Sequence, residues 1–213
     1  MNTLRISEIF YSIQGESSRT GWPTVFIRLT GCPLRCHYCD TAHAFKGGEM
    51  MTIDEILRQT ASYQTSYVTV TGGEPLAQPN CINLLTSLCD EGYKVSLETS
   101  GALDISEVDH RVMNILDLKT PDSGEHDKNL MSNLSYLKPT DQIKFVICSR
   151  EDFDWACEII RTHQLEKLCE LLFSPVWNTL PVEKLAEWLL ESHLNARLQV
   201  QMHKIIWGEN TRR

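Results

Sequence analysis

Clusters of basic residues and long hydrophobic runs are both missing from this sequence. Its 213 residues carry 20 basic and 28 acidic side chains, which gives a net charge of −8. Nucleic-acid binding depends on clustered Lys and Arg that neutralise phosphates, so this balance argues against a nucleic-acid partner. No uncharged apolar stretch approaches membrane-spanning length, and residues 1–10 contain no run like that of a signal peptide. We therefore expect a soluble, cytoplasmic protein that binds no membrane.

Low-complexity tracts and internal repeats are also missing, which excludes disordered and repeat architectures. The composition, 42% hydrophobic and 23% charged, is that of an ordinary globular protein. A chain of 213 residues is long enough for one domain with a buried core and short for two, so we expect a single domain over residues 1–213. Eight cysteines in a reducing compartment favour metal binding or catalysis over four disulfides.

Apolar, β-branched runs alternate with amphipathic stretches along the chain. They predict strands at 24–30, 67–71, 94–98, 112–118, 142–148, 171–176 and 197–203. One helix should begin at Thr52, because Glu55 three residues later completes a capping box, and Gly92 is placed to end another. Helices are expected at 80–91, 152–163 and 182–190, whereas 119–138 should be a loop with at most a short helix.

The order of these elements predicts an α/β fold with a mainly parallel sheet. The strand runs are almost continuously apolar, which is typical of strands covered on both faces. Right-handed strand–helix crossovers then give either a partial (β/α) barrel or an open doubly wound sheet. Both architectures bind ligands at the carboxyl ends of parallel strands, so we expect the functional site there.

Three cysteines, Cys32, Cys36 and Cys39, directly follow the first of these predicted strands. Thiolates suit iron–sulfur clusters and zinc, but a structural zinc ion normally needs four ligands and this loop supplies three. His37 is a poor fourth ligand, because its side chain would have to fold back over its own short turn. A cubane cluster on three thiolates keeps one iron open to an external amine and carboxylate. The remaining cysteines lie in predicted helices and strands and should be plain buried groups: Cys81, Cys89, Cys148, Cys157 and Cys169.

Polar residues close three further strands. The run 71–75, Thr-Gly-Gly-Glu-Pro, offers backbone that can approach a ligand and the Glu74 carboxylate for an ammonium group. The runs 98–101, Glu-Thr-Ser-Gly, and 117–120, Asp-Leu-Lys-Thr, also place charges at strand ends, which favours ligand contact. For either run taken alone, a surface ion pair is the alternative.

The cysteine spacing and the Gly-Gly-Glu strand end together resemble the signature of the radical S-adenosylmethionine enzymes. The segments 10–16, 21–23, 26–28, 39–41 and 201–204 narrow the resemblance to the 7-carboxy-7-deazaguanine synthase family, and it covers almost the whole chain. The resemblance implies a partial (β/α) barrel, a [4Fe–4S] cluster on the three cysteines and S-adenosylmethionine as cosubstrate. The implied reaction contracts 6-carboxy-5,6,7,8-tetrahydropterin to 7-carboxy-7-deazaguanine with loss of ammonia, in the pathway to queuosine and related deazapurines.

The same resemblance assigns residues to ligands, with no catalytic group beyond cluster and cosubstrate. Cosubstrate contacts are implied for Tyr38, Asp40, Gly73, Glu74, Ser100, Asp117, Leu118 and Lys119. Substrate contacts are implied for Ile13, Gln14, Gly15, Glu16, Arg28, Thr71, Glu98 and His203. Gln14 and Glu16 can accept hydrogen bonds from the pterin edge, and Arg28 can meet its carboxylate. Thr41 is implied as a Mg²⁺ ligand, and the implied partners are a second copy of the chain and a flavodoxin- or ferredoxin-type electron donor.

The chain departs from the family pattern at two places. Ser17 stands where the family run Gln-Gly-Glu continues with glycine, at the turn that presents Glu16, and we expect no loss of activity from it. The chain also continues as residues 208–213 beyond the His-Lys pair, so no terminal substrate contact is assigned.

Two other functions remain as alternatives. One is an activase that uses the same radical to generate a glycyl radical on a partner protein, and the other is a non-catalytic zinc-binding or adaptor module.

Overall fold

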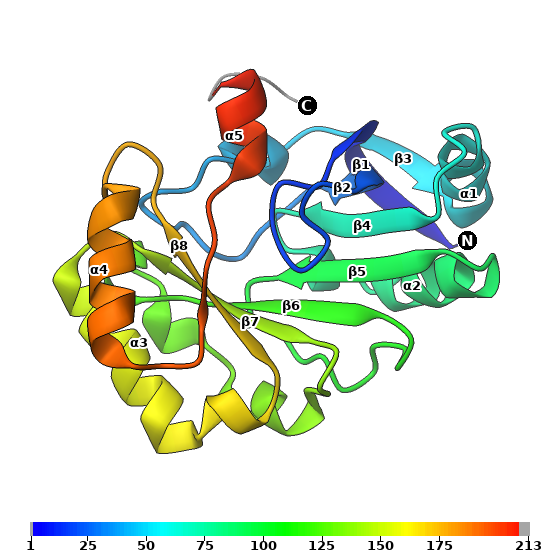
Figure 1. The fold of residues 1–213 in the computed structure, drawn as a ribbon. Coiled ribbons are helices and arrows are strands. Elements are labelled where there is room, and N and C mark those ends of the chain that lie inside the picture. Colours follow the sequence, from blue (N-terminus) through cyan, green and yellow to red (C-terminus); the bar gives the residue numbers. More distant parts are fainter. Residues whose placement is uncertain (1, 209–213) are drawn as a thin grey trace.

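The computed structural model describes residues 2–208 and contains a nine-stranded sheet in the order β3-β1-β2-β4-β5-β6-β7-β8-β9 (Figure 1). Strand β1 pairs antiparallel with β2 and β3, and every pair from β2 to β9 is parallel. The sheet has two edges, β3 and β9, and does not close. The strands are β1 Thr3–Ile13, β2 Pro23–Leu29, β3 Glu49–Thr52, β4 Tyr67–Gly72, β5 Lys94–Thr99, β6 Met113–Leu118, β7 Gln142–Ile147, β8 Glu170–Pro175 and β9 Arg197–Leu198.

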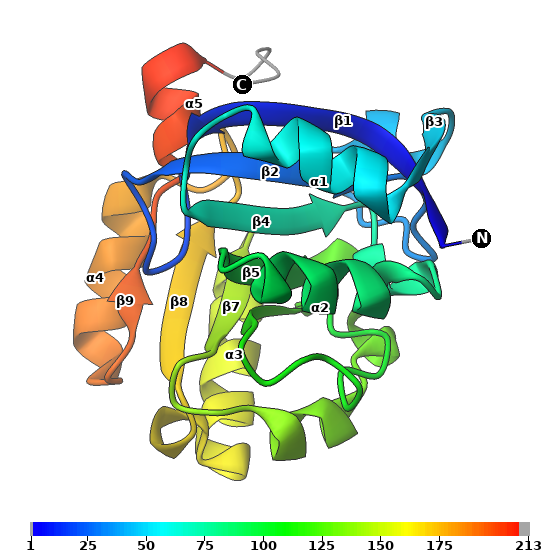
Figure 2. The ribbon, with the colours of Figure 1, turned by 90° about the vertical axis from the view of Figure 1, so that its right-hand side faces the viewer.

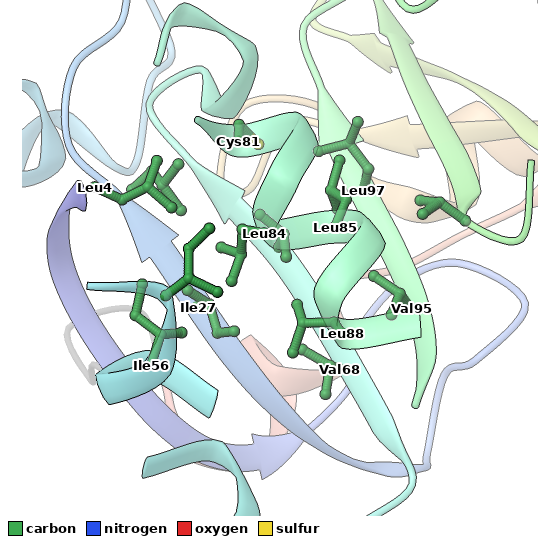
Figure 3. Packing of buried hydrophobic residues seen from close by; sticks show 14 of the residues in the cluster. Leu4, Ile27, Ile56, Val68, Cys81, Leu84, Leu85, Leu88, Val95 and Leu97 are labelled. Atoms are coloured by element: carbon green, nitrogen blue, oxygen red, sulfur yellow. The ribbon is translucent and has the colours of Figure 1, made fainter. Parts of the chain in front are cut away.

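Four α-helices pack against one face of the sheet, which we call the outer face, and a short fifth helix ends the described chain (Figure 2). The leucines of α2, Leu84, Leu85 and Leu88, point into a core shared with β2, β4 and β5 (Figure 3). A second apolar cluster lies between α3, α4 and the strands β6 to β8. The α-helices are α1 Ile53–Ala61, α2 Cys81–Asp90, α3 Arg150–His163, α4 Val182–Ser192 and α5 Met202–Trp207.

The inner face of the sheet is much more polar than the outer face. In β5, Val95 and Leu97 pack into the outer core while Glu98 faces the other way, and in β7 Lys144 lies between core residues in the same manner. The strands therefore alternate more strictly than their apolar runs indicated. One helix-covered face, a polar inner face and an open sheet of mainly parallel strands make the α/β fold a partial (β/α) barrel, as predicted.

Local signals located the main helices well. The Thr52 side chain accepts from the Glu55 amide while the Glu55 carboxylate accepts from the Thr52 amide, which is the predicted capping box. Gly92 follows α2 with φ +84°, the left-handed conformation expected of a helix-ending glycine. The predicted loop 119–138 contains three short 3-10 helices: η3 Pro121–Ser123, η4 His126–Lys128 and η5 Met131–Tyr136. Three more lie elsewhere: η1 Ala42–Phe45, η2 Pro75–Ala77 and η6 Leu165–Lys167.

The predicted strand over 197–203 is wrong in its second half. Only Arg197 and Leu198 pair with β8, and α5 begins at Met202. The amide of Met202 donates to the carbonyl of Gly15 at 3.1 Å. The chain therefore leaves the sheet after β9 and contacts the loop that follows β1. The strands β1 and β3 were not predicted, because Arg5, Ser7 and Glu8 interrupt the apolar pattern of β1 and β3 has only four residues. No helix in the described part of the chain is long and apolar enough to cross a membrane.

Candidate active site

A cavity of about 580 Å³ lies at the carboxyl ends of β2 and β4 to β7, and its size suits a small-molecule ligand. Its walls also include β1, the cysteine loop and α5. A second cavity of about 520 Å³ lies between α3 and α4 on the outer face. Only the first contains the cysteine triplet and the polar strand ends, so we take it as the candidate active site.

Cys32, Cys36 and Cys39 all line this cavity, and each is free and partly buried. The loop is fixed by backbone hydrogen bonds from Gly31 to Ala44 and from Glu74 to Gly31, both at 2.8 Å. Burial raises the pKa of the Cys32 and Cys36 thiols, and a bound metal would favour their thiolate forms.

His37 faces away from the cysteines. Its Nδ1 lies 3.1 Å from the carbonyl oxygen of Asp122, and its ring packs against Gly124. This contact does not favour His37 as a fourth ligand of the cysteine group.

The Gly-Gly-Glu segment contacts the cysteine loop directly. A Cβ on Gly73 would lie 2.3 Å from the carbonyl oxygen of Gly31 and 2.7 Å from the Cβ of Cys32, so only glycine fits there. Glu74 is fully buried, and its carboxylate accepts from the Ser100 amide at 2.7 Å and from the Thr99 hydroxyl at 3.0 Å. Glu74 thereby joins the ends of β4 and β5, and its predicted contact with an ammonium group stays a prediction.

Lys144 of β7 forms the centre of a charged network on the inner face. Its Nζ lies 2.8 Å from Glu16 Oε2 and 3.5 Å from Asp117 Oδ2, and its side chain is 13% exposed. Lys119 adds a second cation, 3.0 Å from the same Asp117 oxygen. Burial alone would lower the pKa of Lys144, but the carboxylates of Glu16 and Asp117 raise it well above its ordinary value. Burial would likewise raise the pKa of Glu16, and Lys144 brings it below the ordinary value.

Glu98 lies beside this network, but its pKa is shifted in the other direction from that of Glu16. Its carboxylate accepts from the Thr71 hydroxyl at 3.0 Å and from the Gln14 amide nitrogen at 3.4 Å. Burial raises the pKa of Glu98, and the nearby Lys144 does not offset that effect. The two carboxyl groups of the pocket, Glu16 and Glu98, therefore have pKa values shifted in opposite directions.

The short helix α5 contributes one wall of the cavity, at the top of Figure 1. Gln201 donates to Glu16 at 2.9 Å, and Lys204 Nζ pairs with Asp40 Oδ2 at 2.8 Å, next to Cys39. His203 packs against Gly15, where a Cβ would lie 2.1 Å from its Nδ1. Burial lowers the pKa of His203, which favours the neutral imidazole at the pocket.

Two buried polar atoms on the cavity wall have no protein partner within residues 2–208: Tyr38 Oη and Asp117 Oδ1. Buried polar groups are normally hydrogen-bonded, so such atoms at a cavity mark contacts for a ligand. Together with three thiol groups and a backbone turn that only glycine permits, they fit a cluster with its cosubstrate.

Ser17 adopts the left-handed backbone conformation, with φ +68°, at the position where the family resemblance led us to expect glycine. Its Oγ accepts from the Arg19 amide at 3.1 Å, and the side chain is buried. The turn that presents Glu16 therefore forms with serine, through a local hydrogen bond that offsets part of the strain.

Most of the site residues predicted from the sequence meet in this one cavity. Those lining it are Ile13, Gln14, Glu16, Arg28, Cys32, Cys36, Tyr38, Cys39, Asp40, Thr41, Thr71, Gly73, Glu98, Ser100, Asp117, Lys119 and His203. Three do not line it: Gly15 lies behind His203, Glu74 is bound by Ser100, and Leu118 packs in the outer core.

Several lining residues were not predicted from the sequence, among them Glu8, Phe10, Phe26, His43, Lys144, Gln201 and Lys204. Lys144 had a signal, because it is the lone charge in an apolar strand. Residues 209–213, for which no contact was assigned, lie outside the described part.

The comparisons with known proteins agree with this geometry. Residues 26–189 match the model of the radical SAM superfamily. The chain is 45% identical to the 7-carboxy-7-deazaguanine synthase of Chlorobaculum tepidum, over 98% of this chain and 96% of the relative. It is 41% identical to the synthase of the same name from Koribacter versatilis, over 98% and 99% of the two chains. The crystal structure of QueE from Escherichia coli has the same fold, with a TM-score of 0.80, 23% identity and coverage of 95% and 96%. The chain therefore belongs to the radical S-adenosylmethionine superfamily and, within it, to the 7-carboxy-7-deazaguanine synthase family.

Proposed function

We propose that this chain converts 6-carboxy-5,6,7,8-tetrahydropterin to 7-carboxy-7-deazaguanine and ammonia by a radical ring contraction. The observation that carries the proposal is a single cavity that joins the cysteine triplet to Gln14, Glu16, Arg28 and Glu98. Near-full-length relatives named as this synthase support it over a glycyl-radical activase. A zinc-binding or adaptor module has no need for this group of buried, charged residues.

The three cysteines would hold a [4Fe–4S] cluster, with one iron left for S-adenosylmethionine. When bound, the cluster supplies the electron that cleaves S-adenosylmethionine to an adenosyl radical. The backbone at Gly73 can approach the cosubstrate, and Ser100, held by Glu74, faces the same cavity. Tyr38 and Asp117 offer the unpartnered Oη and Oδ1 atoms, and Asp40 and Lys119 offer charges beside them.

The substrate pocket would be formed by residues of β2, β5, α5 and the loop that follows β1. Arg28 binds the pterin carboxylate, while Glu16 and Glu98 accept from the N–H groups of the pterin edge. The Gln14 side chain bridges the Glu98 carboxyl group and the backbone of Glu16, since its Nε2 donates to Glu98 Oε1 and its Oε1 accepts from the Glu16 backbone N–H at 3.1 Å. These contacts orient substrate C6 toward the cosubstrate, and the wall formed by α5 excludes water from it.

Magnesium would bind at Thr41. Its hydroxyl donates to Asp40 at 2.9 Å, which leaves the oxygen lone pairs free for a hard cation. Because the protein supplies few oxygens here, the substrate carboxylate and water would complete the coordination shell.

We also propose that the protein works in the cytoplasm as a homodimer with a flavodoxin- or ferredoxin-type electron donor. All eight cysteines are free, which suits a reducing compartment. The dimer and the donor rest on the family resemblance.

Replacement of Arg28 tests the proposed substrate. In Arg28→Ala, kcat/KM for 6-carboxytetrahydropterin should fall roughly 30- to 1000-fold, the loss expected of a buried, charge-assisted substrate contact. Iron content and reductive cleavage of S-adenosylmethionine without substrate serve as controls and should stay unchanged. A near-normal kcat/KM would contradict the proposed pocket, and absence of any pterin binding would favour the activase.

A further inference from the structure

Strand β1 changes face within its own length. It pairs with β2 at Ile6–Leu29 and then at Glu8–Arg28, so Ser7 is an extra residue in a β-bulge. Before the bulge, Leu4 and Ile6 pack into the outer core. Regular alternation would send Glu8 to that core as well. The bulge reverses the alternation, so Ile9 packs toward the core and Glu8 faces the cavity.

Glu8 holds Arg28 by one edge of its guanidinium group. Glu8 Oε1 accepts from Arg28 Nε at 2.7 Å, and the two side chains are only 20% and 18% exposed. His43 approaches the same oxygen, with its Nε2 3.4 Å away. Burial alone would raise the pKa of Glu8, but the hydrogen bond and charge of Arg28 lower it, so the carboxylate is ionised near neutral pH.

Aromatic rings fix the guanidinium group from a second direction. The Arg28 Cζ lies 5.8 Å from the ring centroid of Phe10, within the range of a cation–π contact. Phe10 in turn stacks on Phe26, with 5.0 Å between centroids and 11° between planes. The orientation of Arg28 is thus set by one hydrogen bond and one ring face.

The other edge of the Arg28 guanidinium has no hydrogen-bonding partner in the part of the chain that the structure describes. Among residues 2–208, its guanidinium makes no hydrogen bond or ion pair other than the one from Nε to Glu8. Both terminal nitrogens therefore remain for a ligand on the cavity side, in the planar fork that matches a carboxylate.

We propose that Glu8, turned into the cavity by the Ser7 bulge, is a positioning residue that orients Arg28 for the substrate carboxylate. This inference rests on the proposed function and deepens it. Glu8 can affect Arg28 in two opposing ways, because it orients the guanidinium group but also offsets its charge. Loss of orientation weakens carboxylate binding, whereas loss of the opposing charge strengthens it, so the sign of the effect decides between them.

Binding to the reconstituted holoenzyme with S-adenosylmethionine is the test, with pterin-6-carboxylate and pterin as stable probes. The unchanged protein should bind pterin-6-carboxylate at least about tenfold more tightly than pterin. Glu8→Ala should lose most of this preference by weakening pterin-6-carboxylate alone. Glu8→Gln should keep most of it, since its amide oxygen still accepts from Nε. The Glu8→Ala/Arg28→Ala double variant should bind no worse than Arg28→Ala, and Glu49→Ala, at an exposed position of β3, should change nothing.

Turnover measurements distinguish a positioning role of Glu8 from a general loss of structure or of the cluster. In Glu8→Ala, KM for 6-carboxytetrahydropterin should rise about tenfold with kcat largely kept and iron content unchanged. Equal weakening of both probes in Glu8→Ala would overturn the proposal, as would tighter binding of pterin-6-carboxylate in Glu8→Gln. If the unchanged protein binds both probes equally, the proposed function fails and takes this proposal with it.

Discussion

Lys144 carries the only charge in β7, and the structure places that charge between Glu16 and Asp117 on the inner face. A buried charge is costly unless an opposite charge and hydrogen bonds compensate it. Here one ammonium group compensates the carboxylates of Glu16, in the loop after β1, and Asp117, near the end of β6. Lys144 therefore links two separate walls of the cavity.

Removal of the Lys144 charge should destabilise the fold. Lys144→Met leaves the buried Glu16 carboxylate without its cation and Asp117 with Lys119 alone, a change expected to lower the free energy of unfolding by on the order of 3 kcal/mol. Urea denaturation measures this change in the free energy of unfolding. Adding Glu16→Gln to the same protein should recover part of the loss, because it removes one of the uncompensated charges. A loss below about 1 kcal/mol would indicate an ordinary surface pair instead.

Glu98 should make stability depend on pH in the opposite sense to most carboxylates. Its folded-state pKa is raised, so it stabilises the fold at low pH and this contribution is lost as pH rises through the folded-state pKa. A glutamine side chain has no proton to lose, so Glu98→Gln should gain thermal stability relative to the unchanged protein as pH rises from about 4 to 8. Thermal unfolding across that range gives the comparison, with the exposed Glu107→Gln as control. A difference independent of pH would contradict the account.

At the scale of elements, structure set by local signals was predicted correctly from the sequence, whereas structure set by long-range contacts was not. The start of α1 and the end of α2 were predictable, because a capping box and a helix-ending glycine act within a few residues. Strand β1 was not, since Arg5, Ser7 and Glu8 break its apolar pattern and pairing with β2 compensates for that. The segment after Leu198 reads as strand, but its contact with Gly15 makes it a helix over the cavity instead.

The contact between Gly15 and α5 gives a test of this element. Alanine at position 15 would place a Cβ 2.1 Å from His203 Nδ1 and 2.9 Å from the His203 backbone nitrogen, so α5 must move. We expect Gly15→Ala to bind pterin-6-carboxylate about tenfold or more weakly and to exchange the amide hydrogens of residues 202–207 faster. The iron content should be unaffected. Unchanged exchange in α5 would show that the helix does not depend on this contact.

At the scale of the whole molecule, the sequence predicted the fold class and the centre of the site better than its rim. The cysteine triplet and the polar strand ends are contiguous motifs, and parallel strands bring their carboxyl ends together by geometry alone. Glu8, His43 and Lys204 reach the cavity through a bulge, a 3-10 helix and a C-terminal helix, and none of these is encoded in a short motif. Glu74 was recognised from its motif, and its carboxylate accepts from the Ser100 amide, while its contact with an ammonium group stays a prediction.

The most direct test of the central claim is product formation after anaerobic reconstitution. With about four iron and four sulfide ions per chain, S-adenosylmethionine, a reductant and 6-carboxytetrahydropterin, the unchanged protein should form 7-carboxy-7-deazaguanine, detected by mass spectrometry. Cys157→Ala, at a buried position of α3, should still form product with only modestly lower stability. Cys36→Ala should form none, because the cluster loses a ligand. Product from Cys36→Ala, or none from the fully reconstituted unchanged protein, would contradict the account.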